Sequence, residues 1–584
     1  MMVSLLLASA SLSWADDSKI SPDLRGYTSG SQVQVIVQYA PSAQTNCNGL
    51  LGLLGCVVGD VLNLGGKLVG MLPLVNGLVA QLDGNAIQTL SNRSDVLYIS
   101  RDRPLTLMAD SPGPAVNAPA AWNSNFTGSG IGVALIDSGV NAHKDFNSTG
   151  LLSALLPLSR VAYNQSFLSS SSTGDQYGHG THIAGLIAGN GASSTGSQYS
   201  RTFKGIAPNA KILNLRVLDA NGAGTDSSVI NAIQTAIALK SVYNIRVINL
   251  SLGRGIYESY KLDPLCQAVE QAWKSGIVVV VAAGNDGRYL PTDGYGTITA
   301  PGNDPYVITV GAMKTMDTPT RADDQIASYS SKGPTFIDRI VKPDLVAPGN
   351  LLVSTELPGV TLESSEPGNL VPYNFYMYGG SSASSTSYFT LSGTSMATGV
   401  VSGIVADLLQ AHPTLTPDQV KARLMKTASK SFPQSSSVYD PATGNTYVSY
   451  YDVFTVGAGY VDLAAALASN DTAKGTAMSP TAVLSSNGNV YLTRDSSSTW
   501  GTSSAWTPVA VYGPAEMTSG GTSVMWGAAG PGGSSVMWGA TNDGGTSVMW
   551  GATNDAGTSV MWGASNDGGT SVMWGASGPP AGEQ

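Results

Sequence analysis

The stretch GVALID at residues 132–137 has five apolar or glycine positions and ends in a carboxylate. A short run that is apolar throughout is typical of a strand buried on both faces. Helix-period segments alternate with further runs of this kind, which predicts a parallel sheet covered by helices on both sides. We therefore expect an α/β fold with a mostly parallel central sheet. The other apolar runs are KILNLRVL (211–218), RVINLSL (246–252), IVVVVAAG (277–284) and YVITVGAM (306–313), and the helical segments include 227–242 and 263–276.

The size and charge of the chain narrow the function classes. Its 584 residues correspond to roughly three to four domains of about 150 residues each. A hydrophobic share of 42% supports a large buried core. The net charge of −10, with no basic block, argues against nucleic-acid binding.

The first residues indicate export. Residues 3–12 are apolar and SWA precedes two aspartates, which predicts a secretory signal at residues 1–15 with cleavage after Ala15. No Lys or Arg precedes the apolar part, so a merely apolar N-terminus is the alternative. No run approaches the roughly 18–20 apolar residues of a membrane span. We expect an extracellular protein, with the periplasm or the cell surface as alternatives.

Cysteine is sparse, with three residues in the whole chain. Cys47 and Cys56 are close enough in sequence to pair. Cys266 would then be left alone, and we interpret it as a buried structural thiol rather than a reactive one.

The region ahead of the apolar runs has the pattern of a small α+β module. QVQVIVQYA (32–40) predicts a strand, and the segment 77–104 predicts a strand, a short helix at about 85–90, and a second strand. The module ends near Arg103. The following stretch, LTLMADSPGPAVNAPAAW (105–122), is interpreted as an exposed linker because of its Pro and Gly content.

The chain becomes rich in Ser, Thr and Gly after Asp471 and ends in a repeat, in which SVMWGA recurs every 12 residues. The alternatives are short strands that stack aromatic rings, an element that contacts a cell surface or carbohydrate, and a disordered tail. Regular aromatic residues argue against a plain linker and favour the first two. The repeat tryptophans are Trp526, Trp538, Trp550, Trp562 and Trp574.

Three polar residues stand at the ends of predicted elements. Asp137 ends the apolar run at 132–137, His179 lies between two glycines at a helix start in DQYGHGTHIAGLIAG (175–189), and Ser395 begins a helix in SGTSMATG (392–399). Taken singly, each has an ordinary interpretation as a helix cap or a structural residue. Together they provide a hydroxyl, a base that can take its proton, and a carboxylate that orients the base.

A fourth polar residue follows the run at 277–284. Asn285 comes after a fully apolar strand, where its side-chain amide can face the same cleft. An amide there can stabilise a developing oxyanion together with the backbone N–H of Ser395 at the helix start.

These segments resemble the subtilisin-like (S8) family of serine peptidases, whose motifs ALIDSGV, HGTHIAG, SLG, AAGND and GTSMATG occur here in order between about residues 122 and 468. The resemblance implies a three-layer subtilisin-like fold. It also implies Asp137 as the orienting carboxylate, His179 as general base and then acid, and Ser395 as the nucleophile that forms an acyl-enzyme. Asn285 is implied as the oxyanion donor.

The resemblance also implies a substrate-binding edge. Ser251, Leu252 and Gly253 match the strand that pairs with an extended polypeptide substrate. Asp286 falls near the pocket for the side chain before the cut bond, with a solvated loop residue as the alternative. Arg254 replaces a small residue and could narrow or charge the cleft.

The other histidines are assigned no chemistry. The family pattern treats His182 as structural, His143 is interpreted as structural or at the surface, and His412 as a surface residue at a helix end. The chemistry requires no cofactor. Structural calcium is common in the family, but the segment after His182 does not match the usual ligand loop, so no metal ligand is assigned.

The resemblance divides the chain into a signal peptide (1–15), an inhibitory propeptide (16–110), a peptidase domain (111–470) and the tail (471–584). The propeptide is expected to inhibit its own enzyme and to be removed by self-cleavage close to residues 108–110. Its Gly- and Leu-rich insert at 47–75 departs from the family pattern.

The predicted function is a secreted serine endopeptidase. One alternative is a catalytically silent relative that binds a surface through its tail, although all four chemical roles are filled. A second alternative is a sedolisin-type serine-carboxyl peptidase, against which GHGTH and Asn285 argue.

Overall fold

The computed structural model describes residues 17–25, 30, 32–40, 59, 61–107, 114–148, 158–316, 318, 321–433, 435–441, 443–484, 490–493 and 499, and short strands beyond residue 515. The chain divides into two compact units, Met1–Arg103 with Leu262–Pro264, and the remainder. The predicted signal peptide and the predicted pairing of Cys47 with Cys56 lie outside the described residues.

The first unit is a four-stranded antiparallel sheet in the order β2-β3-β1-β4. Its helix α3 (Gly84–Ser91) begins where the side chain of Asp83 accepts a hydrogen bond from the backbone N–H of Ala86 at 2.9 Å. Apolar side chains of the helix and sheet form one core. The expected strand–helix–strand pattern is present, and the Gly- and Leu-rich insert contributes strand β2. The strands are β1 (Val33–Tyr39), β2 (Lys67–Leu72), β3 (Gly77–Leu82) and β4 (Val96–Arg101).

The second unit is built on a sheet with the strand order β14-β13-β12-β10-β6-β8-β7, with β15 beside β13. Every pair in this sheet is parallel except β13 with β14. The predicted mostly parallel sheet is therefore confirmed. The strands are β6 (Gly132–Asp137), β7 (Val161–Ser166), β8 (Lys211–Arg216), β10 (Ile245–Leu250), β12 (Val278–Ala282), β13 (Ile308–Lys314), β14 (Gln325–Ile326) and β15 (Leu345–Pro348).

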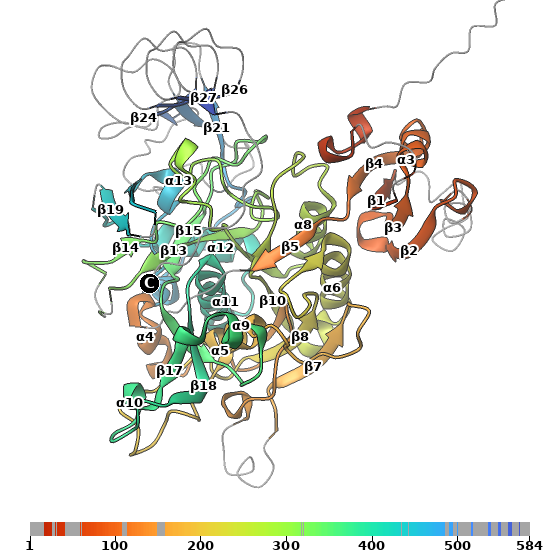
Figure 1. Ribbon diagram of the computed structural model, residues 1–584. Coiled ribbons are helices and arrows are strands. Elements are labelled where there is room, and N and C mark those ends of the chain that lie inside the picture. The colour runs from red at the N-terminus through yellow and green to blue at the C-terminus, as the bar shows by residue number, and fades with distance from the viewer. Residues whose placement is uncertain are drawn as a thin grey trace, which may run out of the picture. The chain divides into compact units, whose positions relative to one another are not determined.

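Helices lie on both sides of this sheet, which makes the unit a three-layer α/β structure (Figure 1). On one side, α5 and α11 pack against each other. On the other side lie α6 and α8. The segment 227–242, expected as one helix, is divided at Leu239 into α6 and α7. The helices are α4 (Ala118–Asn123), α5 (His179–Ala188), α6 (Asp226–Ala238), α7 (Lys240–Tyr243), α8 (Pro264–Lys274), α11 (Thr394–Ala411), α12 (Pro417–Thr427), α13 (Val453–Val456) and α14 (Leu463–Ala468).

Smaller elements complete the second unit. One sheet has the order β16-β18-β17, and β19 pairs with β20 in a hairpin. Beyond Asp471, residues still pack on this unit, because the side chain of Lys421 donates to Ser479 Oγ at 2.9 Å. The elements are β16 (Leu352–Thr355), α9 (Thr361–Ser365), β17 (Leu370–Pro372), α10 (Tyr373–Tyr376), β18 (Ser384–Leu391), β19 (Ser435–Asp440), β20 (Asn445–Tyr450), β21 (Thr481–Leu484), β22 (Val490–Thr493) and β23 (Glu516–Met517).

The prediction of an exposed linker at 105–122 is wrong for its described residues. Residues 104–107 form strand β5 (Pro104–Leu107), which pairs with β11 (Leu252–Gly253) and β9 (Gly224–Thr225). Residues 114–123 fold into a short turn and helix α4, whose small side chains, including Ala118 and Ala121, are buried. The buried Ala118 and Ala121 pack into this unit, which overrides the exposure expected from the Pro and Gly content.

The described strands of the tail repeat form a parallel sheet, β24-β25-β26-β27. The register joins residues 12 positions apart, as in Ser535 with Ser547 and Trp538 with Trp550. Trp526 and Trp574 lie outside the described residues. The strands are β24 (Ser535–Trp538), β25 (Ser547–Trp550), β26 (Ser559–Trp562) and β27 (Ser571–Val572).

Among the described residues, every helix is too short or too polar to cross a bilayer.

Candidate active site

Asp137 and His179 meet at the carboxyl edge of the parallel sheet. Asp137 is the last residue of β6, and His179 is the first residue of α5. The Nδ1 atom of His179 lies 2.9 Å and 3.1 Å from the two carboxylate oxygens of Asp137. Gly180 permits this approach, because a Cβ there would overlap the carbonyl oxygen of Gly139 and lie 3.1 Å from Asp137 Oδ1.

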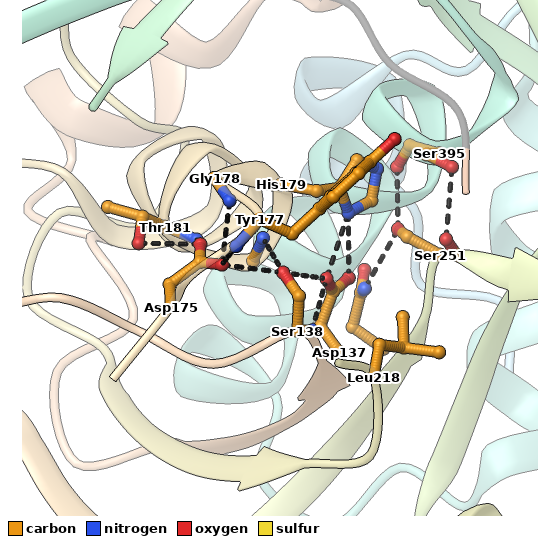
Figure 2. A network of polar contacts seen from close by, with 12 residues as sticks. Asp137, Ser138, Asp175, Tyr177, Gly178, His179, Thr181, Leu218, Ser251 and Ser395 are labelled. Carbon is orange, nitrogen blue, oxygen red and sulfur yellow. Dashed lines mark hydrogen bonds and ion pairs between the residues drawn. The ribbon is translucent and has the colours of Figure 1, made fainter. Parts of the chain in front are cut away.

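Ser395 lies in the first turn of α11, on the far side of the His179 ring from Asp137 (Figure 2). Its hydroxyl donates to the carbonyl oxygen of Ser251 at 3.1 Å, and the Ser251 hydroxyl donates back to the Ser395 carbonyl at 2.7 Å. The helix begins one residue earlier, at Thr394, and Gly393 is its N-cap. Ser395 is therefore not a helix cap, and its hydroxyl is directed to another chain segment.

Asn285 stands beside the same helix start. Its side-chain oxygen accepts hydrogen bonds from the backbone N–H of Thr394 at 3.0 Å and from the Thr394 hydroxyl at 2.9 Å. Because the Thr394 N–H can only donate, the atom that faces it must be the oxygen of the amide. The NH₂ group of Asn285 therefore points away from Thr394 and remains a donor next to Ser395.

The predicted substrate edge is a strand, and a segment of this chain lies on it. Leu107 of β5 is opposite Leu252, and Thr106 is opposite Gly253, in antiparallel register. On its other side β5 pairs with β9, so that Leu105 is opposite Gly224. An extended peptide between two short edge strands is the arrangement of β-strand addition.

The two charged residues near this edge differ in their surroundings. Asp286 is exposed, and its backbone N–H donates to the Ser331 hydroxyl at 3.0 Å. The interpretation of Arg254 as a residue that charges the cleft is wrong, because its buried guanidinium forms an ion pair with Asp226 at 2.9 Å. Asp226 is the first residue of α6, where an acid is stabilised by the helix dipole and attracts the guanidinium.

The remaining histidines are structural. His182 is fully buried, its Nε2 lies 3.2 Å and 3.1 Å from the carbonyl oxygens of Leu352 and Phe389, and burial lowers its pKa to about 3. His143 is buried rather than at the surface; its Nδ1 accepts from the Asp145 N–H at 3.1 Å, and burial lowers its pKa. His412 caps the end of α11 and is half-buried.

The prediction of a buried, structural Cys266 agrees with the structure. Its side chain is fully buried in α8, and its Sγ donates to the side-chain oxygen of Asn303 at 3.3 Å.

The segment after α5 packs against a buried carboxylate. It contacts Asp145, whose carboxylate accepts hydrogen bonds from the Ser193 N–H at 2.7 Å and the Tyr388 hydroxyl at 2.8 Å. Across the part of the chain that the structure describes, no group of three or more His, Cys, Asp or Glu side chains could hold a metal ion.

Asp175 belongs to the site and was missed by the sequence analysis. It is buried four residues before His179, and its carboxylate accepts from the Ser138 hydroxyl at 2.9 Å (Figure 2). The available signal was an acid directly ahead of a helix start, a pattern that indicates an anchored N-terminus. That pattern alone does not distinguish a residue of the active site from an ordinary cap.

A hydroxyl, an imidazole and a carboxylate that meet at the edge of a parallel sheet, in the chain order Asp, His, Ser, define a subtilisin-like serine peptidase. The comparison with known families agrees. The chain belongs to the subtilase family, whose Peptidase_S8 model matches residues 128–445. It is a serine endopeptidase.

The chain is similar to several bacterial proteases. It is 32% identical over 391 residues to the serine protease AprX of Bacillus subtilis (strain 168), covering 65% of this chain and 80% of AprX. It is 34% identical over 370 residues to subtilisin E of the same strain, covering 62% of this chain and 78% of subtilisin E.

Among solved structures, the fold is similar to that of fervidolysin from Fervidobacterium pennivorans, a keratinolytic enzyme related to subtilisin. The TM-score is 0.54 at 22% identity, covering 78% of this chain and 64% of fervidolysin, which is less than two thirds of its length. This likeness supports the shared fold.

Proposed function

We propose that this chain cleaves polypeptides through Asp137, His179 and Ser395, with an acyl-enzyme intermediate. The observation that carries the proposal is the pairing of His179 Nδ1 with Asp137 at 2.9 Å, with Ser395 on the other side of the ring. Since Asp137 only accepts hydrogen bonds when ionised, Nδ1 carries the proton of the neutral ring, and Nε2 carries the lone pair that can accept a proton. His179 can therefore take the proton of the Ser395 hydroxyl.

In the first step, Ser395 Oγ attacks the substrate carbonyl carbon while its proton moves to His179 Nε2. The imidazolium formed is stabilised by Asp137 and then gives the proton to the leaving amine. Water hydrolyses the acyl-enzyme by the same route. The chemistry needs no cofactor, because the chain supplies base, acid and nucleophile.

The negative charge that develops on the substrate oxygen would be held by the NH₂ group of Asn285 and the backbone N–H of Ser395. The Asn285 amide is pre-oriented, since Thr394 holds its oxygen with two hydrogen bonds. A donor held in place before reaction costs no reorganisation when the charge appears.

We further propose that the enzyme is exported as an inactive precursor and matures by self-cleavage. Support comes from β5, which lies on Leu252 and Gly253 as an extended substrate would. The described part of β5 ends at Leu107, which is opposite Leu252, and the carbonyl oxygen of the neighbouring Ser251 is 3.1 Å from Ser395 Oγ. We therefore propose a cut just beyond β5, at the carboxyl side of Met108, within the predicted range 108–110. Asp286 is proposed to lie near the pocket for this side chain.

The predicted propeptide (16–110) would act as the inhibitor of its own enzyme, because its strand β5 occupies the substrate edge. The parallel strands of the repeat are consistent with a structured tail, and we propose that this tail contacts a cell surface or carbohydrate.

The deciding experiment uses Ser395→Ala. The variant precursor should accumulate uncut, with no hydrolysis of a chromogenic peptide, while the wild-type protein produced in the same way is processed. Mass spectrometry of the wild-type product should place the new N-terminus at Ala109. Processing of the purified variant with no other protease present would overturn the assignment.

A further inference from the structure

A buried carboxylate lies next to the proposed catalytic residues and has no role in the mechanism above. Asp175, in the loop before α5, is 4% exposed. It accepts five hydrogen bonds, two of them at the helix start, from the backbone N–H groups of Gly178 at 2.7 Å and Thr181 at 2.8 Å. The others come from Tyr177 N at 3.1 Å, Thr181 Oγ1 at 2.8 Å and Ser138 Oγ at 2.9 Å.

The Ser138 hydroxyl lies between two carboxylates. Its Oγ is 2.9 Å from Asp175 Oδ1 and 3.2 Å from Asp137 Oδ1, and it accepts the backbone N–H of Gly180 at 2.9 Å. A hydroxyl has one proton to donate. The shorter distance directs that proton to Asp175, while the Gly180 N–H occupies a lone pair on the other side.

The carboxylate that accepts the Ser138 proton determines how many hydrogen bonds Asp137 Oδ1 accepts. The same oxygen, Oδ1, already accepts the backbone N–H of Ser138 at 2.7 Å and faces His179 Nδ1 at 2.9 Å. A further donor at that oxygen would spread the negative charge that stabilises the His179 imidazolium. Because Asp175 accepts the Ser138 hydroxyl proton, that proton is not donated to Asp137.

We propose that Asp175 is a positioning residue of this active site: it draws the Ser138 hydroxyl proton away from Asp137 and anchors the start of α5, which carries His179. The proposal rests on the proposed function, in which Asp137 and His179 act on Ser395. Asp175 does not touch the reacting atoms and acts through Ser138 and the helix start.

The titratable groups that face Asp175 come from three elements. They are Asp137 at the end of β6, Tyr177 in the same loop, and Glu356 after β16. Burial raises the pKa of both Asp175 and Glu356. Five donors stabilise the anion of Asp175, whereas Glu356 accepts one hydrogen bond, from the Leu357 N–H at 3.0 Å, and its Oε2 has no partner among the described residues.

The test compares Asp175→Asn with wild-type enzyme by measuring kcat and KM for a chromogenic peptide across pH. Loss of a hydrogen bond to a charged group corresponds to about a 10- to 100-fold change, and we expect a fall of this size in kcat with KM little changed. The Ser138 proton then turns to Asp137, which lowers the pKa of His179. The acid limb of the kcat/KM profile should therefore move to lower pH.

Ser138→Ala and the double variant with Asp175→Asn test whether the effect of Asp175 passes through the Ser138 hydroxyl. In the Ser138→Ala background, Asp175→Asn should shift the acid limb much less, because no hydroxyl proton remains to be redirected. Ser138→Ala alone removes the hydroxyl that competes for Asp137, so its acid limb should stay at the wild-type position, and Ser138→Thr, which keeps a hydroxyl, should make the limb depend on Asp175 again. Thr181→Val removes another donor to Asp175 and should leave the acid limb in place.

The outcomes separate the two proposals. Wild-type kcat and an unmoved acid limb in folded Asp175→Asn, or a change in thermal stability alone, would overturn the positioning role. If Asp175→Asn does not fold, an acid limb that moves to lower pH in Ser138→Ala overturns it equally. Activity in Ser395→Ala would instead refute the proposed function itself.

Discussion

The Asn285 amide offers the sharpest test of how the site stabilises charge. Its oxygen holds the Thr394 N–H and hydroxyl at 3.0 Å and 2.9 Å, which leaves its NH₂ group as the proposed oxyanion donor. Asn285→Ala removes both the acceptor for Thr394 and the proposed oxyanion donor. Loss of one such donor from subtilisin, a relative of this chain, costs about 10²–10³ in kcat, or roughly 2.7–4 kcal/mol.

The same substitution should also destabilise the fold. The Thr394 N–H is buried and loses its acceptor, which costs about 1–3 kcal/mol. Asn285→Asp is the matched control, because a carboxylate keeps an acceptor for Thr394 while replacing the donor by a negative oxygen. It should lower kcat more than alanine does, and its thermal midpoint should stay closer to wild type.

The assay is initial-rate kinetics on a chromogenic peptide, together with thermal unfolding. Because the proposed maturation depends on activity, each variant is processed by a trace of tagged wild-type enzyme that is then removed. A kcat in Asn285→Asp equal to that of wild type would refute the oxyanion assignment. So would a loss in Asn285→Ala confined to KM.

Three further outcomes follow from buried charged groups. Burial raises the pKa of Asp407 to about 9, so the folded state keeps a proton that the unfolded state loses near pH 4. The free energy of unfolding therefore falls as pH rises between these values, by up to about 1.4 kcal/mol per pH unit. Thermal melts should show Asp407→Asn more stable relative to wild type at pH 8 than at pH 5, and an equal difference at both pH values would contradict this. Burial lowers the pKa of His182 from 6.5 to about 3, so this residue contributes stability above pH 6.5 that is lost as pH falls toward 3. His182→Gln should therefore make the free energy of unfolding depend less on pH in this range, and the variant should retain peptidase activity. An inactive but folded variant would refute the structural role of His182. Arg254→Ala leaves Asp226 buried and unpaired and should destabilise the protein by about 3–5 kcal/mol, while a peptide-library profile should show no change in charge preference.

Sequence patterns predicted much of this site. Asp137, His179, Asn285 and Ser395 each follow or begin an element whose period or apolar run is visible in the chain, and such element ends gather at one edge of a parallel sheet. For the tail, the sequence left short strands as one of three alternatives, and the described strands pair residues 12 positions apart, as in Ser535 with Ser547.

Other features depended on contacts between distant segments. The exposed-linker interpretation failed at β5 because Leu105 and Leu107 pair with Gly224 and Leu252, residues more than a hundred positions away. No local pattern reports a partner at that separation.

The amino-acid sequence by itself determined the α/β class, the order of the catalytic motifs and the presence of a repeat, because these follow from periodicity and from the chemistry of short segments. Only the tertiary structure decided what each polar side chain faces. It paired the buried Arg254 with Asp226, directed the Ser395 hydroxyl to Ser251, and directed the Ser138 hydroxyl to Asp175. A hydrogen bond requires two atoms about 3 Å apart, and only packing of the whole chain brings such atoms together.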